Sequence, residues 1–191
     1  MTEASINKQV KLSEHLTLSS VATLGHSSEL DGSRLSPHFT LGEVTKSRHT
    51  EVYNIPSHVA IENLKRVCGW LEELRRRYNL RYVLRSVSPP KGGEKDTEEP
   101  IIINSGYRSP QLNRKVGGST TSNHLTGCAV DIRVAGIEQA LRYAVILMDY
   151  ADETKQDYDE ILIEKNRYGA IWVHFAVRPK DNRRKAAFLQ K

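Results

Sequence analysis

The sequence predicts an α+β domain in which a small antiparallel sheet carries flanking helices. Two segments, residues 58–79 and 137–153, have the apolar spacing of amphipathic helices. Three later segments, residues 128–134, 158–164 and 170–177, alternate between apolar and other residues as strands do. No internal repeat is apparent, so these elements are expected to form one mixed α+β layout.

Size and composition narrow the class of protein. A chain of 191 residues fits a single domain with one core. Hydrophobic residues make up 38% of it, and no apolar run approaches the roughly 20 residues that span a bilayer, which excludes an integral membrane protein. The two cysteines, Cys68 and Cys128, have no CxxC neighbour and are expected to be reduced and buried.

The net charge of +5 is a modest basic excess that is concentrated in residues 66–85 and 177–191. Such an excess is compatible with nucleic acid or with an anionic wall polymer. It is more typical of a solvated helix face and a basic tail, and no nucleic-acid motif accompanies it. We therefore expect no nucleic-acid partner.

The two ends of the chain are expected to lie outside the domain. Residues 1–35 are rich in Ser, Thr, Glu and Lys and are interpreted as a polar leader or linker. They lack the basic segment followed by an apolar stretch that marks a secretory signal, so we expect cytosolic synthesis without Sec export. Residues 36–179 would form the domain, and residues 180–191 a basic C-terminal tail.

The first helices are predicted from their N-caps. Thr40 followed by Glu43 has the spacing of a capping box, which predicts a short helix from residue 41. Ser57 is expected to cap the helix of residues 58–79, and Asn79 to end it. The apolar stripe of this helix consists of Val59, Leu64, Val67, Leu71 and Leu74.

The middle of the chain is expected to hold two strands and a short helix. Residues 80–88 and 100–106 are the predicted strands, on either side of a polar insert at 89–99. Ser109 as N-cap and Pro110 at the first helical position predict a helix over residues 109–116. A Gly- and Ser-rich loop follows and leads toward residue 124.

The strand at 128–134 places an acidic side chain on one face of the sheet. Its two-residue period puts Val130 and Ile132 on a core face and Asp131 on the other, beside the small Ala129. Gly127 allows a sharp backbone turn just before the strand. His124, in the preceding loop, is therefore expected to fold back over Asp131.

A second histidine is predicted on the same face. Residues 158–164 and 170–177 are expected to form a hairpin around the turn KNRYG. The alternation of its second strand places Val173 and Phe175 toward the core and His174 on the opposite face. Two His and one Asp are ligands that a catalytic zinc accepts while it keeps a fourth position for water. The sequence thus predicts a Zn²⁺ site at His124, Asp131 and His174.

Four motifs carry a resemblance to a known family. They are SPHFTLGEVT at 36–45, NSGYRSPQLNRKVGG at 104–118, SNHLTGCAVD at 122–131 and WVH at 172–174. In this order they resemble the zinc-dependent M15 family of peptidoglycan peptidases. That family includes D-alanyl-D-alanine carboxypeptidases and the L-alanyl-D-glutamate endopeptidases of phage lysins. The resemblance covers roughly residues 35–178.

The resemblance implies a Hedgehog/D-Ala-D-Ala peptidase-like fold and assigns roles to single residues. It makes His124, Asp131 and His174 the zinc ligands. It also implies that Arg108 and Ser122 hold the scissile carbonyl or a substrate carboxylate. A guanidinium is a fixed fork suited to carboxylates and to developing oxyanions, which agrees with this role for Arg108. A turn residue is the other interpretation of Ser122.

The general base is the point at which the sequence departs from the family. Several M15 branches supply a carboxylate three residues before the last histidine, where this chain has Ile171. If Glu164 pairs with Ala170 across the hairpin, then Glu160 and Glu164 share the face of His174. A register shifted by one residue would bring Asp159 across instead. We expect Glu164 to be the catalytic carboxylate, with Glu160 and Asp159 as alternatives.

Two functions follow for such a site. The first is a zinc metallopeptidase that cuts D-amino-acid-containing bonds in peptidoglycan stem peptides or muropeptides, as a carboxypeptidase or an endopeptidase. Without a Sec signal it would reach the wall after release, as in phage or prophage lysis, or would act in cytosolic muropeptide recycling. The second is a catalytically inactive, zinc-containing module that binds the cell wall, which the residue at position 171 would allow.

Overall fold

The computed structural model describes residues 32–83 and 98–191. Most of the predicted leader, most of the polar insert and the second half of the strand predicted at 80–88 lie outside these residues. Across the predicted boundary between leader and domain, Arg34–Ser36 forms strand β1, which pairs antiparallel with β2 (Phe39–Thr40).

A five-stranded sheet forms the centre of the domain. Its order is β3 (Ile103–Ser105), β4 (Ala129–Arg133), β6 (Ile171–Ala176), β5 (Glu160–Lys165) and β7 (Lys185–Gln190). Neighbouring strands are antiparallel except for β5 and β7, which are parallel. The α+β class with its small sheet is confirmed, but the sheet is mixed at one edge. That edge lies in the segment predicted as a basic tail, and β7 is a strand that the sequence analysis does not predict.

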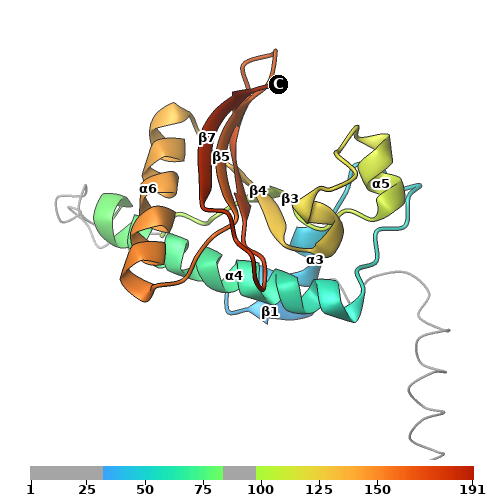
Figure 1. Ribbon diagram of the computed structural model, residues 1–191, viewed down its shortest axis with the longest axis horizontal. Coiled ribbons are helices and arrows are strands. Elements are labelled where there is room, and N and C mark those ends of the chain that lie inside the picture. Colours follow the sequence, from blue (N-terminus) through green and yellow to red (C-terminus); the bar gives the residue numbers. More distant parts are fainter. Residues whose placement is uncertain (1–31, 84–97) are drawn as a thin grey trace, which may run out of the picture.

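Two long helices cover one face of this sheet (Figure 1). They are α4 (His58–Tyr78) and α6 (Ile137–Thr154), and both were predicted within a residue of their bounds. Their buried side chains join one core with the apolar face of β4, β5 and β6, which includes Val130, Ile163 and Phe175. The opposite face of the sheet carries the acidic and imidazole side chains of these strands, together with Leu162 and Trp172.

The predicted caps are present. Thr40 and Glu43 form a capping box at α3 (Leu41–Thr45), and Ser57 caps α4 by accepting a hydrogen bond from the Ala60 backbone. At α5 (Pro110–Lys115) the Ser109 hydroxyl accepts the Leu112 N–H. These bonds fix where each helix begins.

The strand predicted at residues 80–88 is wrong where the structure describes it. Residues Asn79–Val83 form a π-helical turn that continues α4. The Asn79 side chain contributes to this continuation because it donates to the Arg75 carbonyl, one turn earlier, and to the Glu99 carbonyl. A bond within the helix and a contact to a residue twenty positions later therefore act together, and they prevail over the β-favouring composition of this segment.

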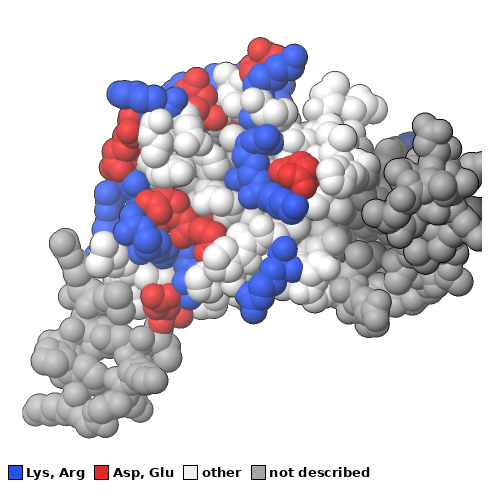
Figure 2. Space-filling view, turned by 90° about the horizontal axis from the view of Figure 1, so that it is seen from below, with Lys and Arg blue, Asp and Glu red and all other residues white. Residues whose placement is uncertain are grey.

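The outer surface of α4 carries both signs of charge. Figure 2 shows Lys and Arg interspersed with Asp and Glu on the underside of the molecule. The pairs include Lys65 with Glu62 and Arg76 with Glu73, each three residues apart on the helix. Among the described residues, no helix has the length and apolar character that crossing a membrane requires.

Candidate metal centre

Two neighbouring strands bring an aspartate and a histidine together. In the β4–β6 pairing Asp131 lies opposite His174, while the adjacent pair of Ile132 and Val173 points into the core. The face assignments predicted from two-residue alternation are confirmed for both strands. Asp131 and His174 therefore lie on the sheet face opposite to α4 and α6.

His124 reaches the same place from a short 3-10 helix, η2 (Asn123–Thr126). Gly127 ends this helix with a φ of 71°, as the predicted sharp turn requires. A Cβ on Gly127 would lie 2.4 Å from the Ala60 carbonyl oxygen, so the turn also packs closely against α4. The Asn63 side chain of α4 donates to the Thr126 carbonyl at 2.9 Å and holds the turn there.

Three ligand atoms converge at this point. His124 Nε2 lies 3.2 Å from His174 Nδ1, and Asp131 Oδ1 lies 3.0 Å from His174 Nδ1 and 3.3 Å from His124 Nε2. A tetrahedral zinc with bonds of about 2.0–2.1 Å needs its ligand atoms roughly 3.3–3.4 Å apart. The described residues form one such cluster, and its donor set and spacing fit a divalent metal.

Hydrogen bonds outside the cluster orient the two imidazoles. The Gly106 carbonyl oxygen lies 2.6 Å from His124 Nδ1, so Nδ1 carries the proton that it donates, and Nε2 has a free lone pair. On His174 the outer nitrogen is Nε2, which lies 3.5 Å from Glu160 Oε2. A partner on the far side of each ring is the usual arrangement for histidines that hold a metal.

The pKa values of the cluster follow from burial and mutual contact. Burial lowers the pKa of His124 and keeps its imidazole neutral. Burial alone would raise the pKa of Asp131, but the two neighbouring histidines bring it well below its ordinary value. For His174, burial is outweighed by hydrogen bonds to Asp131 and Glu160, which raise its pKa to about 9. Without a metal, the cluster thus holds a proton on His174.

Arg108 lies directly behind the aspartate. Its Nη2 donates to Asp131 Oδ2, the oxygen that does not face the histidines, and its Nε donates to Ser105 Oγ at 2.9 Å. This contact leaves Oδ1 as the oxygen that faces the cluster. Its role toward substrate stays a prediction.

Ser122 has a local structural role. Its hydroxyl caps η2 by accepting a hydrogen bond from the His124 backbone N–H at 3.3 Å. The side chain also lines the cleft described below. The observed bond agrees with the turn interpretation, and substrate contact by Ser122 stays a prediction.

The register of the hairpin decides which carboxylates face the cluster. Glu164 pairs with Trp172 rather than with Ala170, a shift of two residues from the register considered in the sequence analysis. A two-residue shift leaves every side chain on its face. Glu160 and Glu164 therefore lie on the face of His174.

The three candidate carboxylates have different surroundings. Asp159 is fully buried and accepts hydrogen bonds from Arg178, Arg183 and Asn123, which leaves it no part in the cleft. Glu160 contacts His174, and this contact is the main reason that the pKa of Glu160 falls to about 2.

Glu164 is the remaining candidate. It is buried and lines the cleft, and its Oε2 lies 2.6 Å from Lys191 Nζ. Ile171, at the position where several M15 branches have a carboxylate, packs against the core instead.

Sequence reasoning missed three residues of this site. Asn123 donates to Glu160 Oε2 at 3.1 Å and to Asp159, and so links η2 to the start of β5. Arg183 pairs with Glu160 at 3.1 Å, and Lys191 with Glu164. The signal for Asn123 was its place beside His124, whereas Arg183 and Lys191 depend on the path of β7, which local pattern does not specify.

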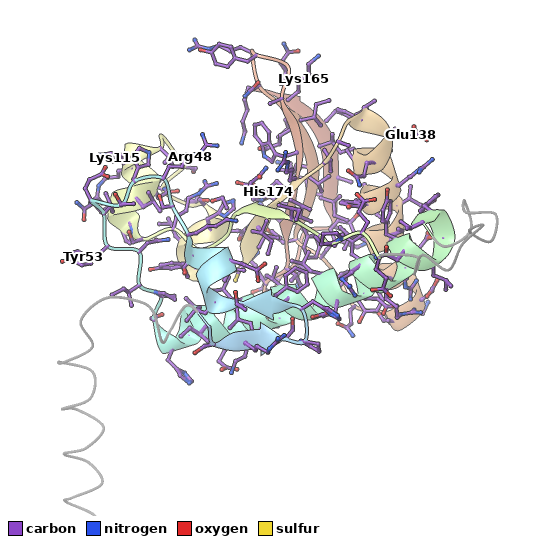
Figure 3. All side chains as sticks on the ribbon, turned by 180° about the vertical axis from the view of Figure 1, so that it is seen from behind. Arg48, Tyr53, Lys115, Glu138, Lys165 and His174 are labelled. Atoms are coloured by element: carbon purple, nitrogen blue, oxygen red, sulfur yellow. The ribbon has the colours of Figure 1, made fainter. Side chains whose placement is uncertain are left out.

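The cluster lies at the base of an open cleft of about 700 Å³. The wall on the sheet side includes Leu162, Glu164 and Trp172, and the opposite wall is the loop of residues 116–123 after α5. Figure 3 shows His174 beside the sheet, on the side toward α5, where Lys115 and Arg48 lie. An extended ligand could therefore reach the cluster from solvent.

Fold and site together define a class: an α+β domain with a His/Asp/His divalent-metal site on the exposed face of its sheet. Residues 93–155, about a third of the chain, match the family model described as Peptidase M15, which supports the resemblance to M15 peptidases that the motifs carry. The matched segment contains His124 and Asp131 and ends before His174. M15 peptidases depend on zinc, and the cluster offers ligands of the type that zinc takes. No curated protein matches the chain.

Proposed function

We propose that this protein is a zinc peptidase that hydrolyses D-amino-acid-containing peptide bonds in peptidoglycan stem peptides. The observation that carries the proposal is the convergence of His124 Nε2, Asp131 Oδ1 and His174 Nδ1 within 3.0–3.3 Å at the base of an open cleft. The M15 match supports peptidase chemistry on substrates of the peptidoglycan type.

The three ligands would hold Zn²⁺ with one coordination position toward the cleft. The metal, when bound, supplies Lewis-acid polarisation of the peptide carbonyl and lowers the pKa of water to near 7. Glu164 is the group of this chain that takes the proton from the attacking water and passes it to the leaving amine. Its Oε2 is held by Lys191, which leaves Oε1 for the proton.

Two further residues act around the ligands. Arg108 pairs with Asp131 and presents its guanidinium at the cleft, where it would bind the substrate carbonyl or a carboxylate. Glu160 fixes the ring of His174 through Nε2. Ser122 keeps His124 in place through the cap of η2 and is the weaker candidate for substrate contact.

The site of action in this proposal is the cell wall, reached after release during lysis. Muropeptide recycling in the cytosol is the alternative setting. Both settings supply the same stem peptides, so the chemistry of the site does not depend on the choice.

A second candidate function is a zinc-containing module that binds the wall without cutting it. Ile171 favours it, because this side chain packs against the core and brings no carboxylate to the cleft. The ion pair between Glu164 and Lys191 also favours it, because this contact occupies one oxygen of the carboxylate.

Mass spectrometry of purified muropeptides after incubation with the protein tests the proposal. We expect new amines and shortened stem peptides with zinc present, and none after chelation. Loss of zinc binding and of cleavage is expected in His124→Ala. Glu164→Gln should retain zinc and lose at least about 100-fold in kcat, as removal of a general base does.

The same measurements separate the two functions. Intact muropeptides after incubation with the zinc-loaded protein, together with retention on isolated sacculi, would select the binding module. Cleavage that survives Glu164→Gln unchanged would remove Glu164 from the mechanism and leave the peptidase function standing.

A further inference from the structure

The cleft does not end at the metal cluster but continues past it. A second hollow of about 410 Å³ shares Ser105, Arg108, Asp131 and Trp172 with the cleft. A third of about 500 Å³ shares Arg48 and Asn104 with the second. Through these shared residues the three hollows adjoin as one groove, and Asp131 of the cluster lines both the first hollow and the second. We call the part in the second and third hollows the Arg48 arm, and the remainder the Lys191 arm.

The two arms differ in whether their Lys and Arg side chains are paired with carboxylates. In the Lys191 arm, Arg183 pairs with Glu160 and Lys191 with Glu164, so each cation is already neutralised. The Arg48 arm is lined by Lys46, Arg48 and Arg133, all exposed. No carboxylate among the described residues pairs with any of these three.

Acidic groups are also distributed unequally. Asp131 is the one described carboxylate that lines the Arg48 arm, and Arg108 pairs with it. His49 faces this arm as well, but its Nδ1 lies 3.4 Å from Glu51, which also pairs with Lys115. The arm therefore presents unpaired positive charge next to a neutralised aspartate.

We propose that the Arg48 arm is a subsite for the carboxylate-bearing part of the peptide substrate, with Arg48 and Arg133 as its specificity-determining residues. This inference rests on the proposed peptidase function. A guanidinium binds a carboxylate through two parallel hydrogen bonds, and partners that are not already paired lose no internal contact when they do so. A groove that continues from the cluster into the Arg48 arm accepts a peptide that extends beyond the scissile bond.

The location of Arg48 makes this contact accessible. Figure 3 shows Arg48 on the α5 side of the molecule, apart from the sheet that carries His174. Arg133 extends β4 by two residues from Asp131, so its side chain lies on the face of Asp131. One arginine from a loop and one from the sheet thus line the same hollow from different elements.

The test compares two stem peptides that differ by one group: one carries a D-glutamate carboxylate and the other the corresponding carboxamide. Dissociation constants are measured by calorimetry on zinc-loaded Glu164→Gln protein, and kcat/KM on the wild type. We expect the carboxylate peptide to bind about fivefold to tenfold more tightly. This advantage should disappear in Arg48→Gln/Arg133→Gln.

Lys65→Gln is the control, because it removes one positive charge from the outer face of α4, where the residue pairs with Glu62. It should leave the advantage unchanged. Equal dissociation constants of the two peptides for the Glu164→Gln protein would overturn the inference. Persistence of the tighter binding of the carboxylate peptide in Arg48→Gln/Arg133→Gln would also overturn it. The same holds if Lys65→Gln reduces this tighter binding as much as the double variant does.

The two proposals can fail separately. If neither peptide is cut by the wild type, the hydrolysis proposal fails, while the dissociation constants still test the arm. If both are cut at equal kcat/KM and bind equally, the peptidase stands and the subsite is refuted. Stronger competition by a phosphate-bearing wall polymer than by the carboxylate peptide would also refute a subsite for peptide carboxylates.

Discussion

Gly127 meets two constraints at a single Cα, since it adopts a left-handed φ of 71° and lies against the Ala60 carbonyl of α4. We predict that Gly127→Ala lowers the free energy of unfolding by at least about 2 kcal/mol, through backbone strain and a steric clash. Because the turn positions His124, zinc affinity should fall as well. Urea denaturation and zinc titration measure the two effects.

Gly69 provides the matched control for this substitution. It lies exposed within α4, and a Cβ there meets no atom within 4 Å. Gly69→Ala should therefore stabilise the protein by about 0.5–1 kcal/mol, the gain expected in a helix interior. Equal destabilisation by both substitutions would show that neither the φ of Gly127 nor its contact with α4 requires glycine.

The protonation of His174 predicts how metal affinity depends on pH. In the metal-free protein its pKa is raised from 6.5 to about 9, so the protonated form stabilises the fold fully below pH 6.5 and loses this effect as pH rises through 9. Zinc must displace this proton. We predict that apparent zinc affinity rises about tenfold per pH unit between pH 6.5 and 8.5.

Competition with a chromophoric chelator at several pH values measures that slope. Glu160→Gln removes one of the contacts that raise the pKa of His174 and should make the dependence shallower. A zinc affinity that does not change with pH in the wild-type protein would mean that His174 carries no proton before the metal binds. Asp131 contributes in the opposite direction: its depressed pKa stabilises the fold above its ordinary value of 3.8, and this effect is lost in acid.

Residues of the metal cluster were predictable because strand alternation is a local rule. Asp131 and His174 are polar side chains among buried apolar neighbours, and the two-residue period assigns them to one face before any pairing is known. The contacts of Glu164 and Glu160 were not predictable to the same degree. They depend on Lys191 and Arg183, which reach the site only through the path of the final strand.

Strand β7 is an element whose contribution can be tested by itself. The N–H groups of Lys185 and Lys191 donate to carbonyls of β5 and the residue before it, so the two-residue repeat assigns the same direction to Ala187. We predict that Ala187→Pro removes a ladder bond and costs about 3 kcal/mol. It should also weaken the contact between Lys191 and Glu164.

Ala186 offers a control of identical chemistry one residue away. Its N–H points to the open edge of the sheet, where proline is tolerated. Ala186→Pro should cost less than about 1 kcal/mol in thermal or chemical denaturation. Similar losses for the two variants would contradict the assigned direction of the ladder.

Elements with local signals were predicted well, and those that depend on tertiary contact were not. The caps at Thr40, Ser57 and Ser109 are side-chain-to-backbone bonds within three residues, which sequence spacing encodes. The turn after Asn79 instead depends on a contact to Glu99, twenty residues later. The sequence of strand β7, KAAFLQ, has four apolar residues in a row, so it lacks the polar–apolar alternation that identifies a strand, although its side chains alternate between exposed and half-buried.

At the scale of the molecule, metal binding should be visible as stability. The ligands come from η2, β4 and β6, and a metal bound only by the folded state stabilises it by about 2.7 kcal/mol at a free concentration of 100 Kd. We predict that zinc raises the Tm of the wild type and not that of His124→Ala. Differential scanning fluorimetry with and without zinc measures both.

His49→Ala is the companion variant, because His49 pairs with Glu51 outside the cluster. It should keep the full zinc-dependent rise in Tm. A rise of equal size in His124→Ala would show that zinc binds elsewhere, and no rise in the wild type would remove the metal from the proposal.

The position of the cluster on the sheet also followed from the sequence, whereas the shape of the groove did not. Alternation in two strands predicts a polar face, but the groove walls come from the loop after α5 and from β7. Their placement relative to the sheet is set by long-range packing. For the same reason the unpaired cations around Arg48 are visible only once the fold is known.

The ligand cluster joins parts of the chain that are 43 residues apart, from Asp131 to His174. An ion held there by the folded state ties these segments together reversibly and opposes local opening of the domain between them. Removal of zinc would then abolish the activity and also change the stability of the fold. It would loosen the connection between the final hairpin and the loop of His124, and expose the protein to proteolysis.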